Sequence, residues 1–199
     1  MQYTGSFKVR GALNKIVSLP VSEREKGIIA ASTGNHGMAT CYAAQKLGPL
    51  PVTIYVPNNA KEVKLQAMQA MGGTVVKVDS NNCIDSEIAA RKASVESKLE
   101  FISPYNDEIV VAGQGTIGYE IVSQLKQYGG KKPDAIFVSV GGGGLIGGIA
   151  GFIKEVLPEC QIIGCQPENS KVMLESIKAG CILQDVPEFP TLSDGTAGG

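Results

Sequence analysis

The amino-acid sequence predicts an α/β fold with a largely parallel sheet. Short apolar runs rich in β-branched residues alternate with longer stretches of helical periodicity, which is typical of βα units. The run at 135–140 is apolar almost throughout, as in a parallel strand that is buried on both faces. Ligands bind beyond the carboxyl ends of strands in such sheets. The glycine-rich and polar segments that follow the strands are therefore the candidate sites.

The predicted strands and helices alternate along the chain. Strands are predicted at residues 27–31, 52–56, 74–78, 100–102, 135–140 and 161–165. Helices are predicted at residues 35–47, 60–71, 84–99, 116–128, 144–156 and 171–179. Gly48, Gly72 and Gly180 mark helix ends because glycine readily adopts the left-handed conformation found there. Pro57 and Pro104 mark strand ends because proline cannot donate to a sheet ladder.

Two candidate boundaries divide the chain, around 24–27 and around 103–115. They predict a small α/β lobe at 27–104. Residues 1–26 together with 105–199 are expected to form part of a second, larger lobe. A length of 199 residues accommodates two such lobes.

The composition predicts an ordinary globular protein. Charged residues make up 19% of the chain and the formal net charge is −1, so no strong field draws it to nucleic acid or to an acidic membrane. Tryptophan is absent, which disfavours a base-stacking surface. We expect neither a nucleic-acid nor a membrane partner, and we find no targeting or spanning segment.

The five cysteines show neither a CxxC pair nor the Cys/His spacing of a zinc site. Cys41, Cys160 and Cys165 lie in apolar runs, where a free thiol behaves as a small hydrophobe. We interpret them as reduced core residues. Reduced cysteines predict an intracellular, cytoplasmic protein.

Four consecutive glycines, Gly141, Gly142, Gly143 and Gly144, stand between a predicted strand and a predicted helix. Backbone without Cβ atoms lets several N–H groups converge on one anion, and a helix start adds favourable potential. The run therefore predicts a phosphate site. The plainer alternative is a flexible turn that lets strand and helix pack closely.

The glycine run also matches a dinucleotide pattern, because Gly142, Gly144 and Gly147 have the G-x-G-x-x-G spacing. That pattern needs an acidic residue at the end of the next strand to bind the ribose. Gln166 stands there, and Glu168 lies beyond a proline. A nicotinamide-binding domain is therefore the less favoured alternative.

A second polar cluster enters the predicted helix at 35–47. It consists of Ser32, Thr33, Gly34, Asn35 and His36. Side chains of this kind are ordinary helix caps, but their density also suits a carboxylate that binds exposed N–H groups and hydroxyls. His36 is the only histidine in the chain. Because a lone histidine is usually structural, we do not assign it proton transfer.

Lys8 lies in a third segment, which reads TGSFKVRGA at residues 4–12. The ordinary alternative is a solvated helix residue, which is the usual fate of lysine. A catalytic lysine must instead lose its proton, and burial beside a phosphate pocket achieves this.

These segments together resemble the fold-type II pyridoxal-phosphate enzymes, in particular the serine/threonine dehydratase and serine racemase group. The resemblance covers essentially the whole chain and rests, in order, on TGSFKVRGA, STGNHG at 32–37, AGQGT at 112–116 and VGGGGL at 140–145. It implies the two-lobed fold of that class, which is like the β subunit of tryptophan synthase, with parallel sheets and flanking helices. It also implies pyridoxal 5'-phosphate as the cofactor.

The resemblance assigns cofactor contacts to three parts of the chain. Lys8 is expected to hold the cofactor covalently, and Phe7 to lie beside the pyridine ring. Asn35 is expected to bind the ring hydroxyl oxygen. The phosphate contacts are assigned to Gly141, Gly142, Gly143, Gly144 and Leu145.

The resemblance also assigns a substrate loop, in which Ser32, Thr33, Gly34 and His36 close on an amino-acid carboxylate. Lys8 and Thr33 are the catalytic candidates, with Lys8 removing the α-proton. Thr33 stands where racemases of the group carry a serine, and its extra methyl group restricts the rotamer. Both Thr33 and His36 favour the dehydratase branch.

The implied activity is an ammonia-lyase that converts L-threonine or L-serine into a 2-oxo acid and ammonia. A serine racemase is one alternative. A truncated relative that binds the cofactor without catalysis is another.

The sequence departs from the family pattern in two respects. Gln166 and Val172 stand where some members bind a divalent cation through carboxylates, so we predict no metal site. Segments that the family places before the lysine motif and after residue 199 are missing here. We therefore expect an incomplete large lobe with exposed sheet edges. Three alternatives follow: the remainder exists elsewhere, the chain associates into a homodimer or higher homo-oligomer, or its activity is impaired.

Overall fold

The structure is a computed structural model that describes residues 2–48, 50–183, 186–193 and 195–196. The chain divides into two compact units, Met1–Gly113 and Gln114–Gly199. Residues 1–26 fall in the first of these units, where α1 (Lys8–Ser18) packs on α3 (Asn35–Lys46). The lobes at 27–104 and in the remainder stay a prediction.

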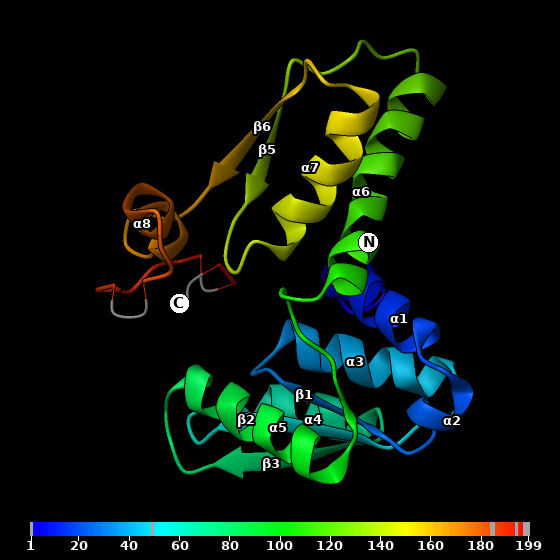
Figure 1. Ribbon diagram of the computed structural model, residues 1–199, viewed down its shortest axis with the longest axis vertical. Coiled ribbons are helices and arrows are strands. Elements are labelled where there is room, and N and C mark those ends of the chain that lie inside the picture. The colour runs from blue at the N-terminus through cyan, green and yellow to red at the C-terminus, as the bar shows by residue number, and fades with distance from the viewer. Residues whose placement is uncertain (1, 49, 184–185, 194, 197–199) are drawn as a thin grey trace. The chain divides into compact units, whose positions relative to one another are not determined.

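The first unit contains a parallel sheet with strand order β3-β2-β1-β4 (Figure 1). Its strands are β1 (Ile28–Ala31), β2 (Val52–Pro57), β3 (Gly73–Val78) and β4 (Glu100–Phe101). Ile28 of β1 pairs with Val52 of β2 and with Glu100 of β4. The sequence prediction of a parallel α/β sheet is confirmed for this unit.

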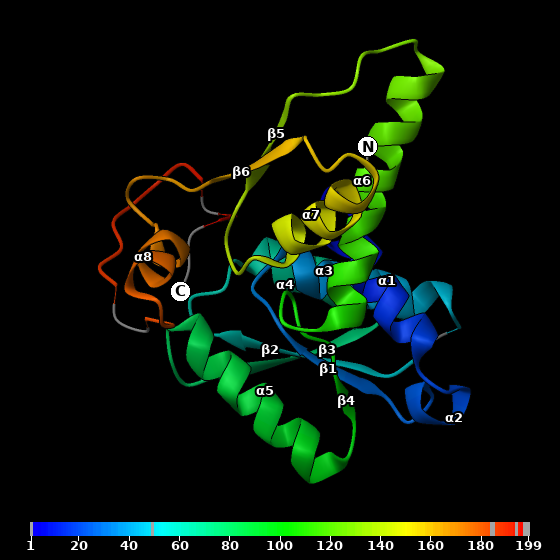
Figure 2. The same ribbon diagram turned by 45° about the horizontal axis from the view of Figure 1, so that its top comes forward.

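Helices cover both faces of this sheet, as Figure 2 shows. They are α3 (Asn35–Lys46), α4 (Glu62–Ala70) and α5 (Cys83–Ser97). Ile28 and Ala30 pack into the core formed with α3 and α4, whereas Ile29 and Ala31 pack into the core formed with α5. Because side chains alternate along a strand, β1 is buried on both faces. Its carboxyl end opens directly into residues 32–35.

Two helices precede β1, and the sequence analysis predicted neither. They are α1 (Lys8–Ser18) and α2 (Val21–Arg24). Phe7 precedes α1 without a side-chain capping bond, and Gly11 lies inside the helix, so the local signals were weak. Val9, Ala12 and Ile16 are buried, and α1 packs on α3. Tertiary packing of one apolar face therefore forms this helix.

The second unit contains a two-stranded parallel sheet and its helices (Figure 1). Its elements are β5 (Ala135–Ser139), α7 (Gly144–Val156), β6 (Gln161–Cys165) and α8 (Val172–Ala179). Val138, Ile149 and Ile153 form its core. The expectation that the run at 135–140 is buried on both faces is wrong here: Phe137 is exposed, since α7 covers only the face that carries Val138.

Helix α6 (Glu108–Gln127) crosses the boundary between the units and begins eight residues before the predicted helix at 116–128. Asp107 explains the early start, because its Oδ1 atom accepts hydrogen bonds from the N–H groups of residues 109 and 110, at 2.9 and 3.0 Å. The region at 103–115 was predicted as a boundary, but Gly113 lies within α6. A Cβ atom there would lie 2.7 Å from the Cα atom of Gly11, so this glycine serves close packing of α6 on α1.

The cysteine prediction holds in part. Cys41 and Cys160 are buried free thiols, as expected, but Cys165 is exposed because it ends β6, an edge strand. Among the described residues, no helix has both the length and the apolar character needed to cross a membrane.

Candidate active site

Lys8 begins α1, and its amine lies in a partly buried position. The Nζ atom donates a hydrogen bond to the backbone carbonyl of Pro104 at 2.6 Å and lies 5.3 Å from the centroid of the Phe7 ring. Burial lowers the pKa of Lys8 to about 8 because the charged form loses hydration. Near neutral pH, Lys8 therefore presents far more free amine than a solvated lysine does, as a nucleophilic or basic lysine requires.

His36 is buried in the first turn of α3. Its Nε2 atom lies 2.8 Å from the carbonyl oxygen of Ile102. A carbonyl only accepts, so Nε2 carries the ring proton and Nδ1 is left as a lone pair. Burial, followed by the positive charge of Lys8, lowers the pKa of His36 to about 3. His36 is therefore neutral, and its hydrogen bond to the Ile102 carbonyl holds the ring in place. This agrees with assigning it no proton transfer.

Residues 32–35 form the turn that leads from β1 into α3. The Gly34 N–H group donates to the Ser32 hydroxyl at 3.1 Å. The first helical bond of α3 runs from Met38 to the Gly34 carbonyl, at 3.0 Å. The N–H groups of residues 35–37 precede that bond and have no helical acceptor. Since α3 has twelve residues, its N-terminus adds positive potential that suits a carboxylate.

Two further side chains contact this turn, and the sequence analysis missed both. Lys64 of α4 reaches over Gly34, with its Nζ atom 3.0 Å from where a Cβ atom on Gly34 would lie. Burial raises the pKa of Cys83, and a hydrogen bond with the Thr33 hydroxyl partly opposes the shift. Neither contact has a local signal, because α4 and α5 reach the turn only through the fold of the sheet.

The tetraglycine turn lies in the second unit, between β5 and α7. The Val140 N–H group donates to the Cys165 carbonyl at 2.8 Å, which fixes the end of the strand. Gly143 has φ +84°, a conformation that favours glycine. The first helical bond of α7 runs from Gly147 to the Gly143 carbonyl at 2.9 Å, so the N–H groups of residues 144–146 have no helical acceptor. This open backbone fits a phosphate.

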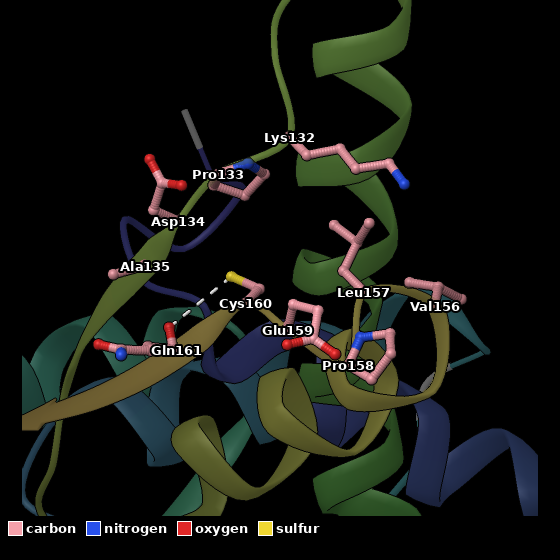
Figure 3. A pocket seen from close by; sticks show the side chains of 10 residues that line it. All are labelled: Lys132, Pro133, Asp134, Ala135, Val156, Leu157, Pro158, Glu159, Cys160 and Gln161. Carbon is pink, nitrogen blue, oxygen red and sulfur yellow. Dashed lines mark hydrogen bonds between the residues drawn. The ribbon is translucent and has the colours of Figure 1, made fainter.

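A cavity of about 540 Å³ lies at the other end of the same two-stranded sheet (Figure 3). Residues at the starts of β5 and β6 and at the end of α7 line it, among them Ala135, Leu157 and Gln161. Ligands of open α/β sheets bind at the carboxyl ends of strands instead. The cavity is therefore separate from the candidate phosphate site.

Gln166 stands where some family members bind a divalent cation, but here its side chain hydrogen-bonds to α8. Its Oε1 atom accepts a hydrogen bond from the Leu174 N–H group at 2.8 Å, which satisfies a donor in the first turn of α8. Within the described residues, no three His, Cys, Asp or Glu side chains gather in a metal-binding group. The absence of a metal stays a prediction.

The structure therefore brings part of the predicted site together. Within the first unit, Lys8 and Phe7 lie beside one another, and His36 interacts with Lys8 electrostatically. Asn35 is exposed at the start of α3. The phosphate residues Gly141–Leu145 belong to the second unit, so the structure describes two half-sites separately.

Comparison with known proteins defines the family. The family model for pyridoxal-phosphate dependent enzymes matches residues 1–199. The chain belongs to this family, and the α/β fold is that of the fold-type II members.

Individual relatives narrow the comparison. The chain is 41% identical over 197 residues to an L-threonine ammonia-lyase of Thermotoga maritima, covering 99% of this chain and 47% of the relative. A structure of the processed form of threonine deaminase isoform 2 from Solanum lycopersicum matches with a TM-score of 0.88 at 37% identity, over 98% of this chain and 55% of that one. A maize serine racemase matches with a TM-score of 0.87 at 32% identity, over 98% and 56%. The chain thus spans about half the length of these relatives.

Proposed function

We propose that this chain carries the cofactor and substrate residues of a pyridoxal-phosphate-dependent ammonia-lyase that acts on L-threonine, L-serine or both. The amine of Lys8 is the observation on which this proposal depends: it is half-buried, its pKa is lowered to about 8, and it lies beside an aromatic ring. The similarity to an L-threonine ammonia-lyase supports the reaction class.

The cofactor assignment uses residues from both units. Lys8 would hold the aldehyde carbon, Phe7 would contact the ring face, and Asn35 would bind the ring hydroxyl oxygen. Gly141, Gly142, Gly143, Gly144 and the N–H group of Leu145 would hold the phosphate. The open N–H groups of the glycine turn and the lowered pKa of Lys8 both fit a phosphate-bearing aldehyde.

The substrate carboxylate binds at the turn that precedes α3, formed by Ser32, Thr33, Gly34 and His36. Its N–H groups and the helix potential favour an anion. His36, neutral and held by Ile102, keeps the turn in place. The hydrogen bond with Cys83 fixes the Thr33 hydroxyl at the edge of this turn.

Bound pyridoxal phosphate supplies the electron sink that stabilises a carbanion at the α-carbon. Lys8 removes the α-proton, and a pKa near the working pH makes it effective as a general base. The β-hydroxyl group would leave as water, and hydrolysis, which takes up one water, would give 2-oxobutanoate from L-threonine or pyruvate from L-serine, together with ammonia. Thr33 stands where racemases of the group carry a serine, and this difference favours dehydration over racemisation.

We further propose a cytoplasmic homo-oligomer. Cys41 and Cys160 are free and buried, which suits a reducing compartment. Phe137, Ile177 and Ile182 are exposed apolar side chains of the second unit, and exposed apolar surface can mark a site of protein–protein contact.

The test uses the purified chain with pyridoxal phosphate. We expect the absorption band of lysine-bound cofactor, release of 2-oxobutanoate from L-threonine, and loss of both in Lys8→Ala. Cofactor absorption without product would support the non-catalytic alternative. Formation of D-serine without pyruvate would support a racemase. Absence of the band in the unaltered chain would overturn the assignment of Lys8.

A further inference from the structure

Lys15 of α1 forms a network of ion pairs in a largely buried position. Its Nζ atom lies 2.7 Å from Oε1 of Glu100 and 2.8 Å from Oδ2 of Asp107. The Lys15 side chain is 11% exposed and that of Asp107 is 18% exposed, whereas that of Glu100 is 41% exposed. Burial alone would lower the pKa of Lys15, but hydrogen bonds with Asp107 and Glu100 outweigh it and raise the pKa. The pairing therefore keeps this buried ammonium charged.

The two carboxylates come from either end of one short segment. Glu100 lies in β4, and Asp107 caps the start of α6. Between them, the Ile102 N–H group bonds the Ile29 carbonyl at 2.8 Å, and the Asn106 N–H group bonds the Ser103 hydroxyl at 3.0 Å. Lys15 thus ties both ends of the segment at 100–107, which includes residues 102–107, to α1.

This segment supplies the backbone acceptors for two residues of the candidate active site. The Ile102 carbonyl lies 2.8 Å from Nε2 of His36, and the Pro104 carbonyl accepts from Lys8 at 2.6 Å. Lys8 and Lys15 are seven residues apart on α1, or about two helical turns, so they lie on the same face. Lys15 can therefore anchor the segment whose Pro104 carbonyl contacts Lys8.

We propose that Lys15 is a positioning residue for Lys8: its pairs with Glu100 and Asp107 hold the segment at 102–107 over the Lys8 amine. This inference rests on the proposed role of Lys8, and it concerns the state of that amine before any cofactor binds. Without the anchor, the segment loosens and water reaches Lys8.

Loss of positioning and a simple field effect both raise the pKa of Lys8 in Lys15→Met, but they have opposite signs in Asp107→Asn, which is therefore the deciding variant. His36 of α3 faces Lys8 and is neutral, while Asp107 and Glu100 face Lys15 from before α6 and from β4. In Asp107→Asn a negative charge disappears, which through the field alone lowers the pKa of Lys8. Loss of positioning raises it, because rehydration favours the ammonium. Asparagine still caps α6, so the helix start is kept.

The experiment measures the pH dependence of Lys8 acetylation in the full chain without cofactor, by mass spectrometry of the Lys8 peptide. The unaltered chain is expected to show a midpoint near 8. Lys15→Met is expected to raise the midpoint by about one unit, so that labelling below it slows roughly tenfold. Asp107→Asn should also raise the midpoint, but by less. Lys15→Arg should leave the midpoint near that of the unaltered chain, because arginine keeps both pairs.

Lys26→Met is the matched control, since it removes the exposed pair of Lys26 with Glu23 from the same unit. It should leave the midpoint unchanged. Circular dichroism and Tm establish that each variant is folded, and Asp107→Asn tests the proposal if Lys15→Met does not fold. An unchanged midpoint in folded Lys15→Met, or a lowered midpoint in Asp107→Asn, overturns the proposal. Because no cofactor or substrate is present, a chain without lyase activity still gives a result on Lys15.

Discussion

The Nζ atom of Lys8 donates a hydrogen bond to the carbonyl of Pro104 across 96 positions of the sequence. This bond joins the first turn of α1 to the segment that leaves the parallel sheet. It places a lysine where its charge is poorly hydrated but its N–H group is satisfied. A lysine of this kind is poised to act as a nucleophile or a base.

The first prediction concerns the pH dependence of cofactor capture. Burial lowers the pKa of Lys8 from 10.5 to about 8, and only the free amine attacks an aldehyde. The rate of pyridoxal phosphate capture should therefore rise with pH and level off above about 8. Borohydride trapping followed by peptide mapping measures it. An unfolded synthetic peptide that spans the same motif is the control and should keep accelerating toward 10.5; identical profiles would contradict the prediction.

His36 should make the fold sensitive to acid. Its pKa falls from 6.5 in the unfolded chain to about 3 in the folded one, so the unfolded state takes up a proton first as pH falls. The stability contributed by neutral His36 is present above 6.5 and is lost progressively toward 3, with a slope of up to about 1.4 kcal/mol per pH unit.

Urea unfolding at several pH values in this range tests His36. In His36→Gln, an amide N–H can still donate to the Ile102 carbonyl, and the slope should become shallower even if the variant is less stable overall. Equal slopes in the two proteins would show that His36 does not titrate on unfolding.

Gly143 should be sensitive to a single added methyl group. Its φ of +84° strains any other residue, and a Cβ atom would lie 3.3 Å from the Cε atom of Met173. We expect Gly143→Ala to cost about 1 kcal/mol of stability and to weaken cofactor binding roughly tenfold by moving the N–H groups that bind phosphate. Absorbance titration and Tm measure the two effects.

Gly151, in the same helix α7, provides the matched control. A Cβ atom there meets no other atom within 4 Å, and alanine is favoured over glycine in a helix by about 0.5–1 kcal/mol. Gly151→Ala should therefore stabilise the chain and leave cofactor binding unchanged. If both variants lose the cofactor alike, the effect does not come from the glycine turn.

Lys64 should assist binding of the substrate carboxylate. Its ammonium lies against Gly34 and adds positive charge to the N-terminus of α3. We expect Lys64→Met to raise KM about threefold to tenfold with little change in kcat, because a charge-assisted contact is lost in binding rather than in chemistry. Lys61→Met, which changes an exposed residue just before α4, should have no such effect. Equal KM values in the two variants would exclude a role for Lys64.

The sequence by itself determined the class of fold and the motifs. Apolar runs and glycine or proline stops predicted the strands at the correct places, because those signals act over a few residues. The sequence also predicted that the turn before α3 and the turn at Gly143 each lead from a strand into a helix. The sequence did not predict α1, whose apolar face is recognisable only once α3 packs against it. It also did not predict the early start of α6, because residues 103–115 were interpreted as a boundary.

Tertiary structure alone decided the surroundings of the reactive groups. The acceptor of Lys8, the carbonyl bound by His36, the ion pairs of Lys15 and the reach of Lys64 all join residues that are distant in sequence. The sheet brings them together, since parallel strands place distant segments at one edge. A pKa depends on that burial and on those partners, so the sequence alone singled out Lys8 as a candidate, whereas the burial that lowers its pKa comes from the tertiary structure.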